Sequence, residues 1–209
     1  MAQEYYIITD EEQIGPLSFR ELTATGPDLH TRIQSAGATE WQYACDIPEL
    51  YPYFAMRGIY LPTGDNLASF GRRLLAWVID YFIISFLASF VIGYLTSSGR
   101  IPAISSYADL LKASPSDLLI MQLCFLVTLV VYNSICEASP LKGSAGKKIC
   151  GMVVVDINGI GLSFINALLR SLGKAISVFV LYLGFLSIFF TEHKQALHDR
   201  LARTYVVKI

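Results

Sequence analysis

Closely spaced cysteines and histidines are missing from this chain of 209 residues. The four cysteines, which form no C-x-x-C pair, are Cys45, Cys124, Cys136 and Cys150. No histidine lies at a zinc-ligand spacing from any of them, so the sequence predicts neither a metal site nor a redox pair. The cysteines are expected to be small apolar side chains in a reducing compartment.

Signals of several other function classes are also absent. A formal net charge of -1, without a basic stretch interleaved with aromatics, excludes a nucleic-acid partner. No Ser/His/Asp order is present, and His193 and His198 are expected on an exposed helical face, so the sequence predicts no enzyme and no cofactor. A signal peptide is missing as well, and the first apolar run is expected to act as an uncleaved insertion signal.

Long apolar runs are what the sequence does contain. The chain is 54% hydrophobic with a mean hydropathy of +0.49, which is too apolar for an ordinary soluble domain. Three apolar blocks follow a polar first third, at residues 74–95, 118–136 and 164–190. The sequence therefore predicts a multi-pass protein of the cell inner (plasma) membrane, with the lipid bilayer as its first partner.

One acid lies inside the first apolar block. Arg73 and Asp80 are seven residues apart, close to two helical turns, so their side chains are expected on nearly the same helix face. An unpaired carboxylate at that depth costs about 2.5 to 3.5 kcal/mol. We therefore expect a coupled Arg73–Asp80 pair in a polar pocket. The alternative is a polar pair that only packs helices, with Arg73 reaching the headgroups.

The first 54 residues have the pattern of a small α+β domain, followed by a linker at 55–69. Residues 5–9 are aromatic and β-branched and predict a strand, and a second strand is predicted near residues 31–34. Ser18 and Glu21 have the spacing of a capping box, which indicates a short helix.

The order of these motifs resembles the GYF-like domain of bacterial membrane proteins. The matching residues are Tyr5, Tyr6, Gly15, Pro16, Leu22, Arg32, Gly37 and Trp41. The resemblance implies a cytoplasmic docking domain that holds a proline-rich peptide or another protein segment on Tyr6, Phe19 and Trp41. The alternative is that these aromatic side chains form the core of the small domain.

Between residues 70 and 209, several separated motifs contain Arg73, Asp80, Gly143, Gly146, Lys147, Gly151, Arg170 and Asp199. These residues and their order resemble the RDD family of membrane proteins. The resemblance implies an α-helical membrane domain with a proposed transport role. A nucleotide-binding loop is not expected, because a Walker loop has four residues between its glycines whereas Gly143 and Gly146 enclose two.

The segment after the second apolar block predicts a short cytoplasmic sheet. Lys147 is expected close to the Glu137 carboxylate. Residues 149–156 and 157–164 read as a hairpin with Asn158-Gly159 at its turn. The final strand, 204–207, is expected to join 152–155, which would bring Asp199 toward the loop that carries Lys147.

Lys and Arg near the ends of the blocks place the N-terminal domain, the second loop and the C-terminal tail in the cytoplasm. Three full crossings would export the tail. The third block is interrupted by Arg170, Lys174 and Gly184, which favours a re-entrant hairpin or a pair of half-helices, with a third full crossing as the alternative.

The favoured topology brings six charged residues into one pocket that faces the cytoplasm: Arg73, Asp80, Glu137, Lys147, Arg170 and Asp199. Buried carboxylates bind cations and protons in transporters, so the sequence favours ion or small-solute transport, with Asp80 as the cation or proton site. Two or three spans are few for a complete carrier, and a homo-oligomer could supply the missing walls. The competing hypothesis is a non-transporting membrane anchor or adaptor that recruits partners through the GYF-like domain.

Overall fold

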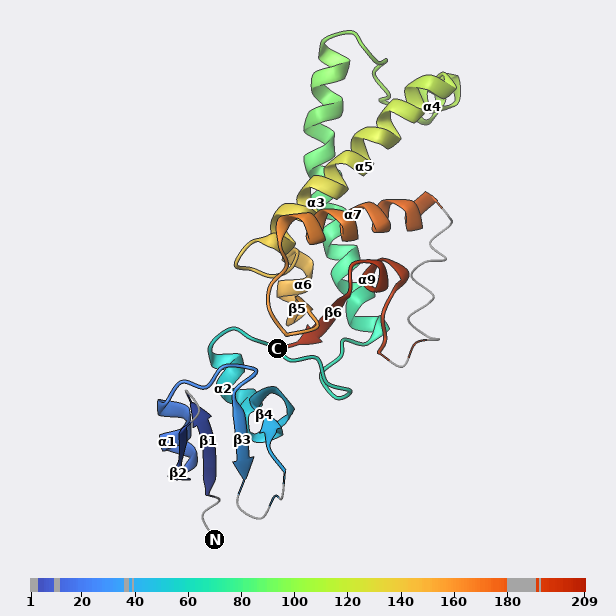
Figure 1. Ribbon diagram of the computed structural model, residues 1–209. Helices are drawn as coiled ribbons and strands as arrows, with labels where there is room; N and C mark the ends of the chain where they lie inside the picture. The colour runs from blue at the N-terminus through green and yellow to red at the C-terminus, as the bar shows by residue number, and fades with distance from the viewer. Residues whose placement is uncertain (1–3, 10–11, 36–37, 39, 180–190, 192) are drawn as a thin grey trace. The chain divides into compact units, whose positions relative to one another are not determined.

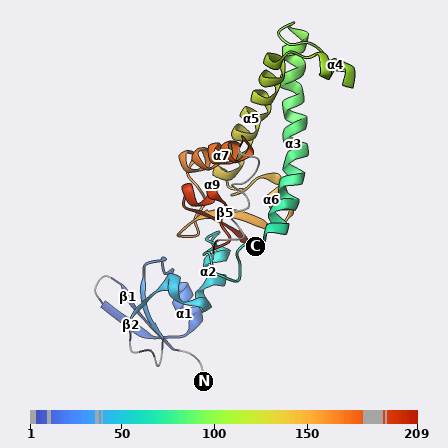
Figure 2. The same ribbon diagram turned by 90° about the vertical axis from the view of Figure 1, so that its right-hand side faces the viewer.

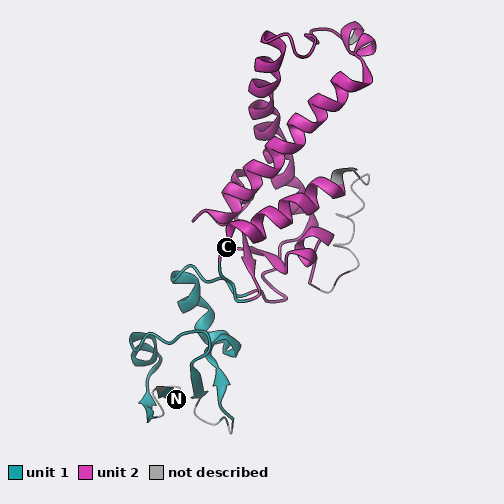
Figure 3. Ribbon diagram, turned by 45° about the horizontal axis from the view of Figure 1, so that its top comes forward, with its two compact units in different colours: residues 1–61, 158–160 teal, residues 62–157, 161–209 magenta. Residues whose placement is uncertain are grey.

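The computed structural model describes residues 4–9, 12–35, 38, 40–179, 191 and 193–209. The chain divides into two compact units, which Figure 3 shows in different colours. Unit 1 comprises residues 1–61 and 158–160, and unit 2 comprises residues 62–157 and 161–209. The predicted order, a small α+β region and then a helical region with a short sheet, is confirmed.

Unit 1 is built on an antiparallel sheet of four strands in the order β2-β1-β3-β4. Its elements are β1 (Tyr5–Thr9), β2 (Glu12–Leu17), α1 (Phe19–Ala24), β3 (Arg32–Ser35), β4 (Gln42–Tyr43), two 3-10 turns (Ala44–Asp46 and Pro48–Leu50) and α2 (Tyr51–Met56). Alternation along β1 places Tyr5 and Ile7 in the core with Leu22. The predicted capping box is present: the Ser18 N–H donates to the Glu21 carboxylate at 2.8 Å, and the Glu21 N–H donates to Ser18 Oγ at 3.3 Å.

Two long apolar helices dominate unit 2 (Figure 1). They are α3 (Phe70–Ser97) and α5 (Pro115–Ala138), with the short α4 (Tyr107–Lys112) between them. Both are long and apolar enough to cross a membrane, so the first two predicted blocks are confirmed as helices. Large apolar side chains such as Phe82, Phe86 and Val127 are exposed, as expected of helices that face lipid.

A two-stranded antiparallel sheet lies at the end of unit 2 where α3 begins. β5 (Met152–Asp156) pairs with β6 (Thr204–Lys208), and Leu67, just before α3, forms a bridge to Val207. The predicted pairing of 152–155 with 204–207 is therefore confirmed. The predicted hairpin is wrong: Asn158 lies in a turn, but no strand follows it within residues 157–163, because β6 is the partner of β5.

The described part of the third apolar block forms α7 (Phe164–Phe179), and α9 (Leu197–Leu201) comes later in the chain. α7 packs on α5 and α9, and it lies across the direction of α3 in both views (Figures 1 and 2). Because β5 precedes α7 and β6 follows α9, the chain enters and leaves this region at the same sheet. The choice between a re-entrant hairpin and a third crossing also involves residues 180–190, which lie outside the described residues.

Candidate functional site: a buried charge network

Seven charged side chains come together in unit 2 where α3, α5, α7, α9 and α6 (Ala145–Ile149) meet. We call them the charge network: Arg73, Asp80, Glu137, Lys147, Arg170, Lys174 and Asp199. All six residues of the predicted pocket belong to it. Six of the seven are buried, and the side chain of Arg73 is 11% exposed. The chain therefore places its charged groups inside and its apolar groups outside at this level.

Asp199, in α9, joins arginines from two different helices. Nη1 of Arg73, in the first turn of α3, donates to Oδ2 at 2.5 Å, and Nε of Arg170, in α7, donates to Oδ1 at 3.0 Å. Arg170 Nη2 also contacts Oδ1. Burial alone would raise the pKa of Asp199, but the guanidinium groups of Arg170 and Arg73 hold that pKa well below its usual range. Asp199 therefore stays ionised and fixes both arginines.

Glu137, near the C-terminal end of α5, is fully buried and receives three cations at one oxygen. Oε1 accepts from Lys147 Nζ at 2.5 Å, from Lys174 Nζ at 2.6 Å and from Arg170 Nη1 at 2.7 Å. Its other oxygen, Oε2, is buried and has no hydrogen-bond partner among the described residues. Arg170 links this carboxylate to Asp199, so six of the seven charges, all except Asp80, form one continuous chain.

Lys174 lies between two polar side chains of α5. Its ammonium group donates to Glu137 Oε1 and to Asn133 Oδ1, the latter at 2.8 Å. Burial lowers the pKa of Lys174 well below its usual value, although the Glu137 carboxylate opposes the change.

Asp80 has only neutral hydrogen-bond donors. Its Oδ2 accepts from Ser144 Oγ at 2.5 Å, and its Oδ1 accepts from the Tyr132 hydroxyl and the Gly146 N–H, both at 2.9 Å. Ser144 and Gly146 belong to the N-terminal end of α6, so the carboxylate anchors that end to α3. A Cβ on Gly146 would lie 2.2 Å from the Ala76 carbonyl oxygen, which explains why a glycine is needed here.

The predicted Arg73–Asp80 pair is wrong. Arg73 donates to the Asp199 carboxylate and to the backbone oxygens of Ala68 and Lys194, whereas Asp80 is held by the donors of Tyr132, Ser144 and Gly146. The helical period brought the two side chains toward one face, but nearer partners from other elements take both. The predicted contact of Lys147 with Glu137 is confirmed.

Two polar residues of the site, Tyr132 and Asn133, were missed at the level of sequence, and Lys174 was noticed only as a break in the third block. Asn133 lies four residues before Glu137 inside an apolar helix, a spacing that indicates one shared polar face. The exposed position predicted for His198 is wrong: its side chain is 4% exposed, and burial lowers its pKa to about 3. His193 is exposed as expected.

Two of the three aromatic residues predicted to dock a peptide, Tyr6 and Phe19, lie on opposite faces of the sheet of unit 1. Tyr6 alternates with Tyr5 on β1 and so lies on the opposite face of the sheet from the core. Phe19 contacts the Tyr5 ring, with centroids 6.2 Å apart, and is 41% exposed. Trp41 is half-buried just before β4.

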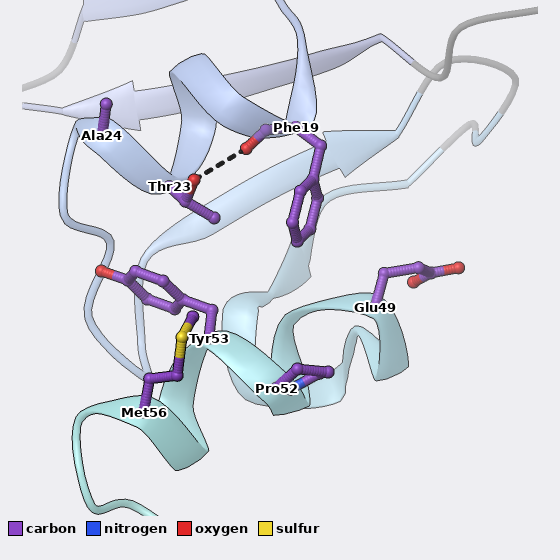
Figure 4. Close-up of a pocket in the computed structure, with 7 residues that line it drawn as sticks. All are labelled: Phe19, Thr23, Ala24, Glu49, Pro52, Tyr53 and Met56. Atoms are coloured by element: carbon purple, nitrogen blue, oxygen red, sulfur yellow. Dashed lines mark hydrogen bonds between the residues drawn. The ribbon is translucent and has the colours of Figure 1, made fainter.

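Only Phe19 of the three lines the groove shown in Figure 4. The groove has a volume of about 460 Å³ and lies between α1 and α2. Its lining residues are Phe19, Thr23, Ala24, Glu49, Pro52, Tyr53 and Met56. The side chain of Met56 is 82% exposed, which leaves an apolar rim open to a partner.

Comparison with known sequences places this geometry in a family. The RDD family model matches residues 67–203, which include the whole charge network and leave out the sheet of unit 1. The uncharacterized protein YxaI of Bacillus subtilis (strain 168) is 32% identical over 149 residues, which cover 68% of this chain and 98% of that protein. No solved structure matches the chain. With two candidate membrane helices around a buried network of arginines and acids, the chain belongs to the RDD family of membrane proteins.

Proposed function

We propose that the charge network is the site of ion or small-solute handling, with a cation or a proton as the species bound. The observation that carries the proposal is Glu137, whose Oε1 accepts from three cationic side chains while Oε2, fully buried, has no partner among the described residues. A buried carboxylate oxygen without a donor is costly. The three cationic donors at Oε1 repel a further cation, so in the proposal a proton or cation binds at Oε2 when one of these donors moves away.

The charge network costs free energy of folding if its role is only structural. Buried ion pairs are often no more stabilising than apolar residues of similar volume, because removing each charge from water costs several kcal/mol. Ionisable groups at membrane depth are, for this reason, a default indication of function. In the proposal Glu137, Lys174 and Asn133 form the binding site. Asp80, which is already satisfied by three donors, positions α6.

We also propose that both termini lie in the cytoplasm. Leu67 before α3, β5 after α5 and β6 at the end of the chain are joined by backbone pairing, which supports one common side of the membrane for all three. The basic residues near the ends of the spans favour the cytoplasmic side. Labelling of a cysteine at position 209 in intact cells tests this, since labelling from outside would contradict it.

Ion flux in proteoliposomes tests the function itself. Purified chain is reconstituted and exposed in turn to gradients of Na⁺, K⁺ and H⁺, with empty vesicles as the baseline. The proposal expects flux above that baseline for at least one ion. A homo-oligomer is expected to supply further walls of the pathway, because two spans are few for a carrier.

A second candidate function rests on the groove of unit 1. We propose a GYF-like docking role in which the groove between α1 and α2 holds a proline-rich segment against Phe19, Tyr53 and Met56. Binding of a labelled proline-rich peptide to the full chain tests it. Phe19→Ala should weaken that binding, whereas Tyr6→Ala, on the other face of the sheet, should leave it unchanged.

A further inference from the structure

The amphipathic pattern of α7 is inverted with respect to a helix on the surface of a soluble protein. The side chains that face the inside of unit 2 are polar: Arg170, Ser171, Lys174 and Ser177. Most of the side chains that face outward are apolar, and five of them are between 44% and 69% exposed: Phe164, Ile165, Leu169, Leu172 and Ile176. Asn166, in the first turn, is exposed as well. A soluble helix buries the apolar stripe, so the medium around α7 has to be apolar.

The contacts of α7 fix its level along the two long helices. Lys174 reaches Asn133 and Glu137 in the last two turns of α5, and Arg170 shares Asp199 with Arg73 in the first turn of α3. α7 therefore lies at the level where α3 begins and α5 ends. It crosses the direction of α3 rather than following it (Figures 1 and 2).

The two faces of α7 agree with this orientation. A helix that spans a bilayer exposes apolar side chains on most of its circumference, whereas the described part of α7 has one apolar stripe and one charged face.

We propose that α7 lies in the plane of the membrane, at the end of the spans where α3 begins, with its apolar stripe covered by the acyl chains of that leaflet. Lipid is the occupant because the stripe continues the apolar surface of the helices it touches, where Val131 and Ile135 of α5 are 50% and 57% exposed. In this position α7 separates the charge network from the acyl chains. Access of water or ions to Glu137 then comes from the side of the β5–β6 sheet.

Depth-dependent quenching by brominated lipids distinguishes an in-plane helix from a spanning one. In the full chain, with Trp41 and Trp77 replaced by phenylalanine, a single tryptophan is placed at position 165, 169, 172 or 176. The protein is reconstituted in vesicles whose acyl chains carry bromine at a shallow, middle or deep carbon. A spanning helix would spread positions 165 and 176 over about 16 Å of depth, whereas an in-plane helix holds them at one depth.

The matched control is a series on α3, with tryptophan at position 82, 86, 90 or 94. These positions are also exposed and apolar, and they extend over about 18 Å along a spanning helix. We expect the α3 series to be quenched at graded depths and the α7 series to be quenched most by one and the same lipid.

A graded α7 series would overturn the proposal, as would tryptophans that no brominated lipid quenches. In the second case, quenching by aqueous iodide would show that the apolar stripe faces water. Protection from iodide would show that a second copy of the chain or another protein covers it. Nitroxide labels at the same α7 positions, in a chain with its four cysteines changed to serine, provide a second measurement of depth through oxygen and nickel relaxation. That readout needs no tryptophan background.

Discussion

Arg73 donates to Asp199 at 2.5 Å, although the two residues are 126 positions apart in the chain. Asp80, only seven positions from Arg73 on the same helix, is held instead by hydroxyl and backbone donors. The two acids that lie in the motifs of the family thus have different partners. Asp199 ties α3, α7 and α9 together through charge, and Asp80 anchors α6 to α3.

A double-mutant cycle separates these two roles. Arg73→Ala leaves Asp199 with one of its arginines missing, and the loss of one partner from a buried ion pair typically costs about 3 to 5 kcal/mol. We expect Arg73→Ala and Asp199→Ala to be strongly non-additive in thermal stability in detergent, and Arg73→Ala and Asp80→Ala to be additive within about 0.5 kcal/mol. Strong coupling in the second cycle, with additivity in the first, would restore the pairing expected from helical spacing.

Gly146→Ala tests the anchoring of α6. The new Cβ would lie 2.2 Å from the Ala76 carbonyl oxygen and 2.9 Å from the Asp80 carboxylate, so α6 must move away from α3. We expect a lower unfolding temperature and a lower yield of folded protein in the membrane.

Gly93→Ala is the matched control for that change. Gly93 lies within α3, and a Cβ there meets nothing within 4 Å, so the substitution should stabilise the helix by about 0.5 to 1 kcal/mol. Equal effects of the two glycine substitutions would show that the close approach of α6 to α3 is not a constraint.

The lowered pKa of Lys174 predicts a pH dependence of stability with a definite sign. In the unfolded chain the lysine binds a proton up to a pH of about 10.4, whereas the folded protein releases it at lower pH. The unfolded state therefore binds more protons in this window, and stability rises with pH by up to about 1.4 kcal/mol per pH unit, levelling above the unfolded pKa.

The measurement is the unfolding temperature in detergent between pH 7 and pH 10, taken as the difference between the wild type and Lys174→Met. Subtraction removes the contribution of groups that the two proteins share. The difference should shift in favour of the wild type as pH rises. A difference that is flat, or that moves the other way, would mean that Lys174 is charged throughout and that the charge network carries an excess cation.

Local signals in the sequence predicted much of the fold. The capping box of Ser18 and Glu21 is complete within four residues. The apolar strand 204–207 was correctly paired with 152–155, because the sequence of this region offers few other strands with which it could pair. The predicted hairpin failed because the turn at Asn158 is local, whereas the choice of the partner for β5 is made by the tertiary fold. Secondary structure could therefore be predicted where the residues that determine it are close together in the sequence.

Six residues of the charge network could be named from the sequence, some because charged residues are rare in apolar blocks and others, such as Lys147 and Asp199, because they match the motifs of the RDD family. The partner of Lys147 was predicted correctly, whereas Arg73 was given the wrong partner. His198 was placed outside because a helix of five residues shows no reliable face, and in the structure it packs against Gly173, where a Cβ would lie 3.0 Å from His198 Cβ. Asn133 was a readable signal, since an amide one turn before Glu137 in an apolar helix needs a polar partner, and that partner is Lys174.

The most direct test of the ion-handling role is the flux of Na⁺, K⁺ and H⁺ into proteoliposomes for the wild type, Glu137→Gln and a control variant, Asp65→Asn. Glu137→Gln keeps the size of the side chain but removes the charge around which Lys147, Arg170 and Lys174 gather, whereas Asp65 is exposed and lies outside the charge network. We predict that wild type and Asp65→Asn carry the same flux above empty vesicles and that Glu137→Gln, at equal reconstituted amount, loses at least tenfold. Flux of the wild type no greater than that of empty vesicles, or undiminished flux in Glu137→Gln, would contradict the assignment of ion handling to this site.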